Sequence, residues 1–196
     1  MSMEPTDKDA RDRADMKALQ AGHDAALNDL MERHATPVFH FLCRMVGNED
    51  DANDLAQETF VRVFKAHASY RAEQRFSTWL FTIAANLARN HFRWRARHPN
   101  ISLDAENGEA EQSLGSTLPA TTATPKESAI AAERAAAVRE AVRNLPEDLR
   151  EAIVLCEWEE RSVAEAATIL AASPKAVESR LYRARQLVRE RLKGWL

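Results

Sequence analysis

Polar and aromatic side chains recur along one segment of the chain, from about Ser77 to Arg97, in a pattern that suits nucleic acid. At spacings of three and four residues, one helical stripe holds Thr78, Thr82, Asn86, Arg89, Arg93 and Arg97. Arginine neutralises phosphates and asparagine hydrogen-bonds base edges, while Phe76, Trp79 and Phe92 offer planar faces to an unpaired base. Stacking a base on an aromatic ring contributes about 1 to 3 kcal/mol, which roughly offsets the few kcal/mol that extruding the base costs. The pattern predicts a site for single-stranded or melting DNA.

The same segment also fits a solvated arginine face on a helix whose opposite stripe is core. That opposite stripe holds Leu80, Ile83, Ala84, Leu87, His91 and Trp94. We favour the binding interpretation for Arg89 and Arg93, and we expect His91 and Trp94 to be buried.

A second group of basic side chains follows a helix-turn-helix pattern near the C-terminus. Ser162 and Glu165 form a capping box that starts a short helix, and Ser173 with Pro174 starts the next helix three residues after the first ends. The side chains that this second helix turns outward are Lys175, Ser179, Tyr182, Arg183 and Gln186. Such side chains read bases in the major groove. An αα-hairpin that binds no DNA is the alternative.

Arg180 lies at the flank of the inner stripe formed by Val177, Leu181 and Ala184. It either joins the basic face or makes an ion pair with an acid on the preceding helix, such as Glu165.

Helices of two small bundles are predicted to position these groups. In the first bundle we expect one helix from about Asp24 to Arg33, a second from Pro37 to Gly47, and a third that Asn48 caps. Long stretches are rich in Ala, Leu, Arg and Glu, and no segment alternates with the period of two that marks a strand. The predicted fold class is all-α, with two small helical domains joined by a flexible linker.

The domain boundaries follow from composition. Residues 99–127 lose helical periodicity and collect prolines, glycines, Ser, Thr and acids, which is typical of a flexible linker. The linker separates a first domain, residues 24–98, from a second, residues 128–196. Residues 1–23 carry no motif, and we interpret them as a disordered N-terminal extension.

Charge along the 196 residues alternates in four blocks that sum to a net charge of -3. Residues 1–70 and 99–172 are acidic, at -5 and -8, whereas residues 71–98 and 173–196 are basic, at +5 each. A domain that binds DNA by itself usually has a basic excess overall. Because the acidic blocks repel the phosphates that the basic blocks attract, we expect weak binding of nucleic acid by the isolated chain.

Several classes of protein are excluded or disfavoured. No apolar run approaches the roughly 18 residues that span a bilayer, and no signal peptide precedes the first bundle, so we expect no membrane insertion and a cytoplasmic location. Cys43 and Cys156 are interpreted as reduced core residues. His34, His40 and Cys43 lack the spacing of a common zinc motif, so we expect no metal and no cofactor. Five scattered glycines exclude a P-loop, and the chain is interpreted as no enzyme.

Four motifs, in order, resemble those of bacterial sigma factors. They are Asp51-Ala-Asn-Asp-Leu-Ala-Gln-Glu-Thr-Phe60, Arg75-Phe-Ser-Thr-Trp-Leu80 followed by Ile83-Ala-Ala-Asn86, Leu145-Pro-Glu-Asp-Leu-Arg150, and Val177-Glu-Ser-Arg-Leu-Tyr-Arg-Ala-Arg185. The group that the chain is most similar to is the extracytoplasmic-function (ECF, group IV) type. The resemblance covers about residues 24–98 and 128–193.

The resemblance implies a dissociable subunit that directs core RNA polymerase to particular promoters and helps to open them. Docking on the β′ clamp coiled coil is implied for Asp51, Asp54, Gln57 and Glu58. Capture and reading of the minus-ten element are implied for Asn86, Arg89, Arg93, Tyr70, Arg71 and Trp79. Reading of the minus-thirty-five element is implied for Lys175, Ser179, Arg180, Tyr182 and Arg183. The family also implies a contact with the β flap and control by an anti-sigma factor.

The chain departs from the family pattern in the helix-turn-helix. Ala171 stands in the turn where glycine is frequent, and Lys175-Ala176 stands where a Gly-Thr pair is frequent. Glu178 takes a position that is commonly basic. The promoter sequence therefore does not carry over from the family. A repressor or activator independent of polymerase is the alternative function, but it leaves the arginine and aromatic helix of the first domain without a task.

Overall fold

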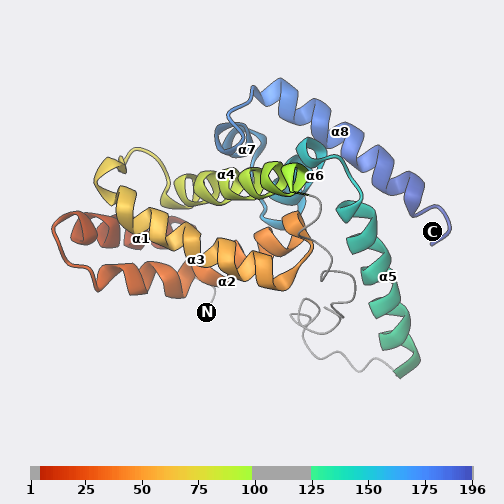
Figure 1. Cartoon of the computed structure of the whole chain (residues 1–196), viewed down its shortest axis with the longest axis horizontal. Helices are drawn as coiled ribbons and strands as arrows, with labels where there is room; N and C mark the ends of the chain where they lie inside the picture. Colours follow the sequence, from red (N-terminus) through yellow and green to blue (C-terminus); the bar gives the residue numbers. More distant parts are fainter. Residues whose placement is uncertain (1–4, 99–124, 196) are drawn as a thin grey trace.

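The computed structural model describes residues 5–98 and 125–195, and within these residues every regular element is a helix (Figure 1). The first unit consists of α1 (Pro5–Gln20), α2 (Ala26–Val46), α3 (Glu49–Ala66), the short 3₁₀ turn η1 (His67–Ser69) and α4 (Phe76–Arg97). The second consists of α5 (Pro125–Arg143), α6 (Glu147–Ile153), the π-helical turn η3 (Val154–Trp158), α7 (Val163–Ile169) and α8 (Pro174–Arg191). The predicted all-α class is confirmed. The predicted linker lies outside the described residues except for its last three, which begin α5.

The turn between α2 and α3 forms as the sequence predicts. Gly47 takes the left-handed conformation, with φ at 75°, and its N–H bonds the carbonyl of Cys43. The side chain of Asn48 accepts a hydrogen bond from the backbone N–H of Asp51 at 2.8 Å. Three acids lie in the first turn of α3, where the positive end of the helix dipole favours negative charge.

One continuous helix, α2, replaces the two helices predicted on either side of Pro37, so that prediction is wrong. Buried residues recur at helical spacing on both sides of the proline, at Leu30, His34, Val38 and Phe41. This unbroken stripe packs on the core, and the packing outweighs the backbone hydrogen bond that proline cannot donate.

The N-terminal extension is ordered where the structure describes it, so the prediction of disorder is wrong for those residues. Met16 and Leu19 of α1 are fully buried in the core of the first unit. Asp12 is 1% exposed, and its carboxylate accepts hydrogen bonds from Nε2 of His34 at 2.8 Å and Nε of Arg33 at 3.0 Å. Asp12, Met16 and Leu19 lie on one helical face, a short stripe that the abundant charges of this segment conceal in the sequence.

The helix-turn-helix of the second unit has the predicted caps. Ser162 and Glu165 make both hydrogen bonds of the capping box, and Ser173 accepts from the N–H of Ala176. Ala171 occupies the turn with φ at 49°, a conformation that costs a residue with a Cβ about 1 kcal/mol more than glycine. The turn therefore forms without the glycine that is frequent in it.

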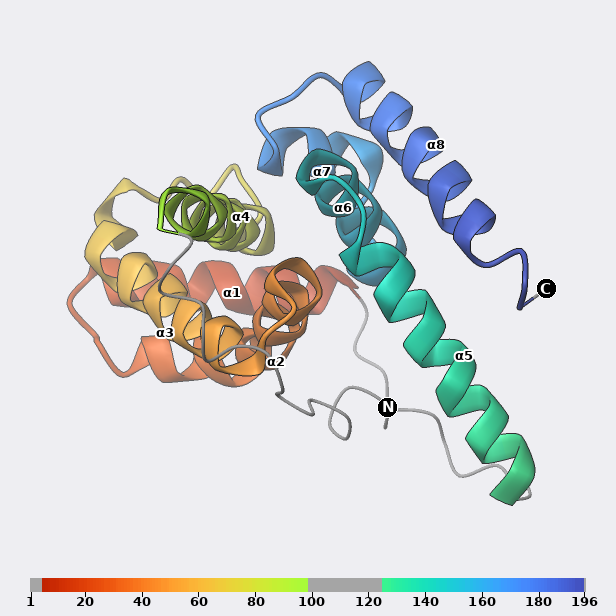
Figure 2. The ribbon, with the colours of Figure 1, turned by 45° about the vertical axis from the view of Figure 1, so that its right-hand side comes forward.

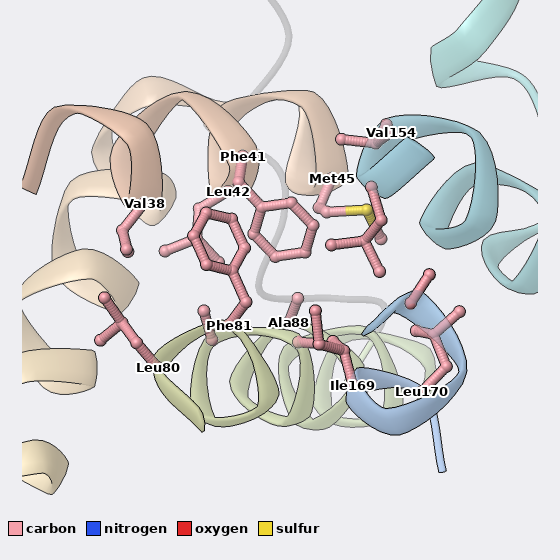
Figure 3. Packing of buried hydrophobic residues seen from close by; sticks show 14 of the residues in the cluster. Val38, Phe41, Leu42, Met45, Leu80, Phe81, Ala88, Val154, Ile169 and Leu170 are labelled. Atoms are coloured by element: carbon pink, nitrogen blue, oxygen red, sulfur yellow. The ribbon is translucent and has the colours of Figure 1, made fainter. Parts of the chain in front are cut away.

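A shared hydrophobic core joins the two units (Figure 3). Phe41 and Met45 of α2 and Phe81 of α4 lie close to Val154 of η3 and Ile169 of α7. Cys43 is buried and Cys156 half-buried, both as free thiols. α5 and α8 extend away from α1 and α3, on the far side of this core (Figure 2). None of the described helices is long and apolar enough to cross a membrane.

Candidate nucleic-acid interface

The polar stripe of α4 is exposed in its middle and at its C-terminal end. Asn86 is exposed, and its side-chain carbonyl accepts a hydrogen bond from Nη1 of Arg89 at 2.9 Å. Arg93 is exposed and donates to Oδ1 of Asn90 at 2.5 Å. Thr78 is buried, so its predicted outward position is wrong. The usable stripe thus begins at Thr82, which is half-buried, and continues through Asn86 to Arg97.

Arg89 has a partner in the second unit. Its Nε donates to Oε1 of Glu151 on α6 at 2.6 Å, and Glu151 is only 4% exposed. Burial raises the pKa of Glu151, and the hydrogen bond and charge of Arg89 oppose that rise. One arginine of the predicted DNA-binding face is therefore held by a buried carboxylate in this conformation.

The aromatic residues divide differently from the prediction. Phe76 is 1% exposed and belongs to the core, so it cannot offer a face to a base. Trp79 and Phe92 are half-buried. Trp94 was expected in the core but is 44% exposed and stacks on His98, with 4.9 Å between ring centroids. His91 is half-buried, with Nε2 at 3.4 Å from the carboxylate of Asp51.

Trp94 lies beside an open groove at the C-terminal end of α4. Its lining residues are Leu55, Leu87, Asn90, His91, Arg93, Trp94, Ala96 and Arg97. The groove combines apolar side chains with two arginines, so the only exposed aromatic ring of the described part of α4 lies next to the basic stripe. Trp94 and Arg97 are three residues apart, and this helical spacing already indicates in the sequence that the ring and the basic stripe lie side by side.

The loop between α3 and α4 is folded around Tyr70. Tyr70 is 6% exposed, its hydroxyl donates to the carbonyl of Gln74 at 2.8 Å, and its ring lies 5.3 Å from that of Trp79. Ser69 and Arg71 are exposed. The structure therefore places Arg71 at the surface and makes Tyr70 the internal support of the loop.

The acidic side chains of α3 point in two directions. Asp54 and Gln57 are exposed, and Glu58 accepts from Nε of Arg62 one turn later at 2.9 Å, a bond that lowers the pKa of Glu58. Asp51 instead faces α4, with its carboxylate 3.6 Å from Nη1 of Arg95. Asp54, Gln57 and Glu58 form one exposed face, and Asp51 lies at its edge.

The second helix of the helix-turn-helix presents a continuous outer face. Lys175, Ser179 and Arg183 are exposed, and Tyr182 is 64% exposed, with its hydroxyl accepting a hydrogen bond from Gln186 at 2.7 Å. The structure thus brings these predicted side chains together on one side of α8.

Arg180 is half-buried beside this face. Its Nε lies 3.5 Å from Oδ2 of Asp148 on α6, so Arg180 does pair with an acid, but that acid is not Glu165, the example that the sequence offered. Glu165 instead pairs with Arg75, at 3.0 Å.

Two matches to family models decide the identity of the chain. Residues 30–98 match Sigma-70 region 2, and residues 135–188 match Sigma-70, region 4. The chain belongs to the sigma-70 family. The match to region 2 also explains the first unit. The alternative function, a repressor or activator that works without polymerase, gives this unit no role.

Similar proteins place this sigma factor in the ECF group. It is 33% identical to the ECF RNA polymerase sigma-E factor of Haemophilus influenzae over 92% of this chain and 95% of that one. It is 31% identical to the RNA polymerase sigma-H factor of Pseudomonas aeruginosa, over 95% and 96% of the two chains. Among solved structures, CnrH in complex with the cytosolic domain of CnrY superposes with a TM-score of 0.68 at 26% identity, covering 94% of this chain and 98% of that one.

The two units of the sigma factor are also held together by ion pairs that the sequence interpretation did not identify. Nη1 of Arg44 lies 3.4 Å from Oε1 of Glu159, and Nη1 of Arg75 lies 3.0 Å from Oε1 of Glu165. Burial raises the pKa of Glu159 to about 7, although the positive charge of Arg44 opposes the rise. The contact between the units therefore contains carboxylates that are withdrawn from water.

Two arginines of the second unit reach into the first. Arg150 donates to the carbonyl of Met45 at 2.5 Å, and its guanidinium lies 5.5 Å from the ring of Phe92. The guanidinium of Arg161 lies 4.6 Å from the ring of Phe81. Arg150 ends one of the four family motifs, but nothing in its spacing shows that its partners lie on α2 and α4.

Proposed function

We propose that this sigma factor divides promoter recognition between two exposed faces. The face of α4 around Asn86, together with Arg71 and Trp79 of the adjoining loop and helix, captures and reads the minus-ten element. The outer face of α8, around Ser179, Tyr182 and Arg183, reads the minus-thirty-five element. Exposure of Asn86 and Arg183 on separate helices carries this proposal, because each is free to approach DNA from its own unit.

Arg89, Arg93 and Tyr70 take different parts in the minus-ten site. Arg93 is exposed and suited to phosphate or base, and Arg89 becomes available when it leaves Glu151. Tyr70 acts by holding the loop, because its ring is buried and its hydroxyl is bonded to Gln74. In the second unit Lys175 contributes phosphate attraction and Arg180 flanks the reading face.

The exposed acidic face of α3 is the proposed docking site for core RNA polymerase. Asp54, Gln57 and Glu58 lie on it, and Asp51 lies at its edge. The partner in this proposal is the β′ clamp coiled coil, while the second unit contacts the β flap. The chain acts in the cytoplasm as a binding factor rather than as an enzyme.

Control by an anti-sigma factor is also proposed. A solved structure of similar fold is the sigma factor RpoE in complex with the anti-sigma factor NepR from Bartonella quintana, at 24% identity and a TM-score of 0.64. The shared fold supports the idea that the surfaces of this chain accept such a partner.

Two substitutions test the division between the faces. In holoenzyme assembled with core RNA polymerase, Arg183→Ala should weaken binding to the upstream element about tenfold, because a bidentate base contact contributes roughly 1 to 3 kcal/mol. Asn86→Ala should leave upstream binding unchanged and lower the rate of promoter opening. Footprinting measures the first effect, and permanganate reactivity of unpaired thymines measures the second.

Arg189→Ala is the matched control, since Arg189 is an exposed arginine on α8 beyond the reading face. It should lower binding to all DNA sequences slightly and equally. Identical effects of the Arg183 and Asn86 substitutions on both steps would show that the division of labour is wrong.

A further inference from the structure

Helix α1 holds the loop between α3 and α4 at both of its ends. At the start of the loop, Nε2 of Gln20 donates to the carbonyl oxygens of His67 at 2.9 Å and Tyr70 at 3.0 Å. At the end of the loop, Oδ2 of Asp9 lies 2.9 Å from Nε of Arg75. Asp9 and Gln20 are eleven residues apart, or about 16 Å along a helix. One rigid element therefore spans the loop.

The hydrogen bonds of Gln20 fix the short turn η1. His67 and Tyr70 lie at the two ends of this turn, so a single amide group with two donors bonds the carbonyls on either side. A glutamine uses both of its N–H groups in this arrangement. A side chain without donors at the same place leaves both carbonyls without this partner.

Helix α1 is itself fixed on the other helices of the first unit. Its inner residues Met16 and Leu19 are fully buried, and the carboxylate of Asp12 is bonded to Arg33 and His34 of α2. The helix therefore transmits the position of α2 to the loop.

We propose that α1 acts as a brace, an element that holds the loop between α3 and α4 in a fixed position, and that Gln20 is a positioning residue for base capture. The proposal rests on the proposed role of the loop and of Asn86. Tyr70 holds the loop from within, and α1 holds it from outside, which leaves Arg71, Ala72 and Glu73 exposed at its tip. A loop fixed in this way presents its tip to an unpaired base without first having to become ordered.

Two substitutions of Gln20 separate hydrogen-bond donation from shape. Gln20→Glu keeps the size and shape of the side chain but removes both donors. Gln20→Lys changes the shape but keeps N–H donors at similar reach. If Gln20 acts through hydrogen-bond donation, Gln20→Glu should be defective and Gln20→Lys should behave as the wild type. If Gln20 acts through packing alone, Gln20→Lys should be defective and Gln20→Glu should behave as the wild type. Lys17→Ala, an exposed position one turn earlier on α1, is the control.

The readout is binding of the assembled holoenzyme to forked promoter DNA whose minus-ten strand is unpaired. Two DNAs are compared, one intact and one with an abasic site at the captured base. We expect Gln20→Glu to reduce the preference for the intact strand about tenfold, the size of one lost base contact. Affinity for core polymerase and the thermal midpoint of unfolding should stay at the wild-type values, and Gln20→Lys and Lys17→Ala should keep the preference.

Asn86→Ala serves as the reference for the proposed function. If it abolishes the preference while Gln20→Glu keeps it, the brace is overturned and the role of Asn86 stands. If Asn86→Ala itself keeps the preference, the proposed minus-ten function of α4 is overturned. A loss of core binding or of thermal stability in Gln20→Glu that matches the loss of preference also overturns the brace, because it shows a general structural role.

Discussion

Asp12 is a carboxylate that the fold withdraws from water and surrounds with donors. It is 1% exposed and bonded to His34 and Arg33 of α2. Burial raises the pKa of Asp12, but the hydrogen bonds and charges of His34 and Arg33 outweigh burial, and the net pKa lies below its ordinary value. The ionised form is therefore the one that the folded state prefers.

We predict that Asp12→Ala lowers the free energy of unfolding by about 2 to 3 kcal/mol at pH 7, because it removes one partner of a buried charged cluster. A carboxylate with a lowered pKa stabilises the fold above its unfolded-state pKa of about 3.9, and this stabilisation is lost as pH falls through the lower folded-state value. In urea unfolding, the free energy of unfolding of the wild type should exceed that of Asp12→Ala by the same amount at pH 6 and pH 5. This difference should be lost below about pH 4.

Asp7→Ala is the control for this prediction, since Asp7 forms an exposed ion pair with Arg11 one turn later in the same helix. Its effect should stay below about 0.5 kcal/mol. Equal effects of the two substitutions would show that the Asp12 cluster adds no stability beyond that of a surface pair.

Helical spacing predicted the exposure of several single residues of the candidate site, and it failed at two positions on α4. Asn86 and Arg183 are exposed as the spacing of their helices predicts. Thr78 and Trp94 lie near the ends of α4, where neighbouring elements rather than periodicity decide burial, and both predictions are wrong. The partner of Arg180 depends on where α6 crosses α8, and no local pattern specifies that crossing.

At the scale of elements, α2 shows a stripe of buried residues overriding a local helix breaker. Pro37 lies in the middle of the helix and has no N–H to donate to the carbonyl of Arg33. The sequence indicates a break there, because the cost of an internal proline is about 3 kcal/mol. The stripe that buries Leu30, His34, Val38 and Phe41 requires a continuous helix.

We therefore predict that Pro37→Ala raises the free energy of unfolding by about 1 to 3 kcal/mol. The substitution restores the missing hydrogen bond, and part of the gain is offset by the greater freedom of the unfolded chain. The shift of the urea midpoint measures it. Thr36→Ala, at the exposed neighbouring position, should gain only a few tenths of a kcal/mol from helix propensity. If Pro37→Ala instead lowers the free energy of unfolding, packing of the half-buried proline ring contributes more to stability than the restored backbone hydrogen bond.

On the scale of the whole molecule, the two units meet through a core and through ion pairs, one of which uses an arginine of the proposed minus-ten face. Arg89 lies on the polar stripe of α4, and its guanidinium is bonded to the buried Glu151 of α6. The charge blocks of the sequence predict weak binding of DNA by the isolated chain. The fold adds a second cause of weak binding that the charge blocks do not contain, since Arg89 of the proposed minus-ten face is already paired with Glu151 within the protein.

Separation of the two units of the sigma factor would break contacts that the structure shows between them. Separation exposes the core residues of Figure 3 to water, and it also frees Arg89 from Glu151. Only the sum of these terms determines how firmly the units stay together in the free protein.

We predict that Glu151→Gln weakens the contact between the units by about 1.5 to 3 kcal/mol, the contribution of a hydrogen bond to a charged group. Small-angle scattering of the isolated sigma factor should show a larger radius of gyration, and its affinity for single-stranded minus-ten DNA should rise because Arg89 is released. Glu157→Gln removes a carboxylate that pairs with Arg185 inside the second unit, and it should change neither quantity. An unchanged radius together with unchanged DNA affinity in Glu151→Gln would mean that the Arg89–Glu151 pair does not hold the units together, and that Arg89 is free to bind DNA without their separation.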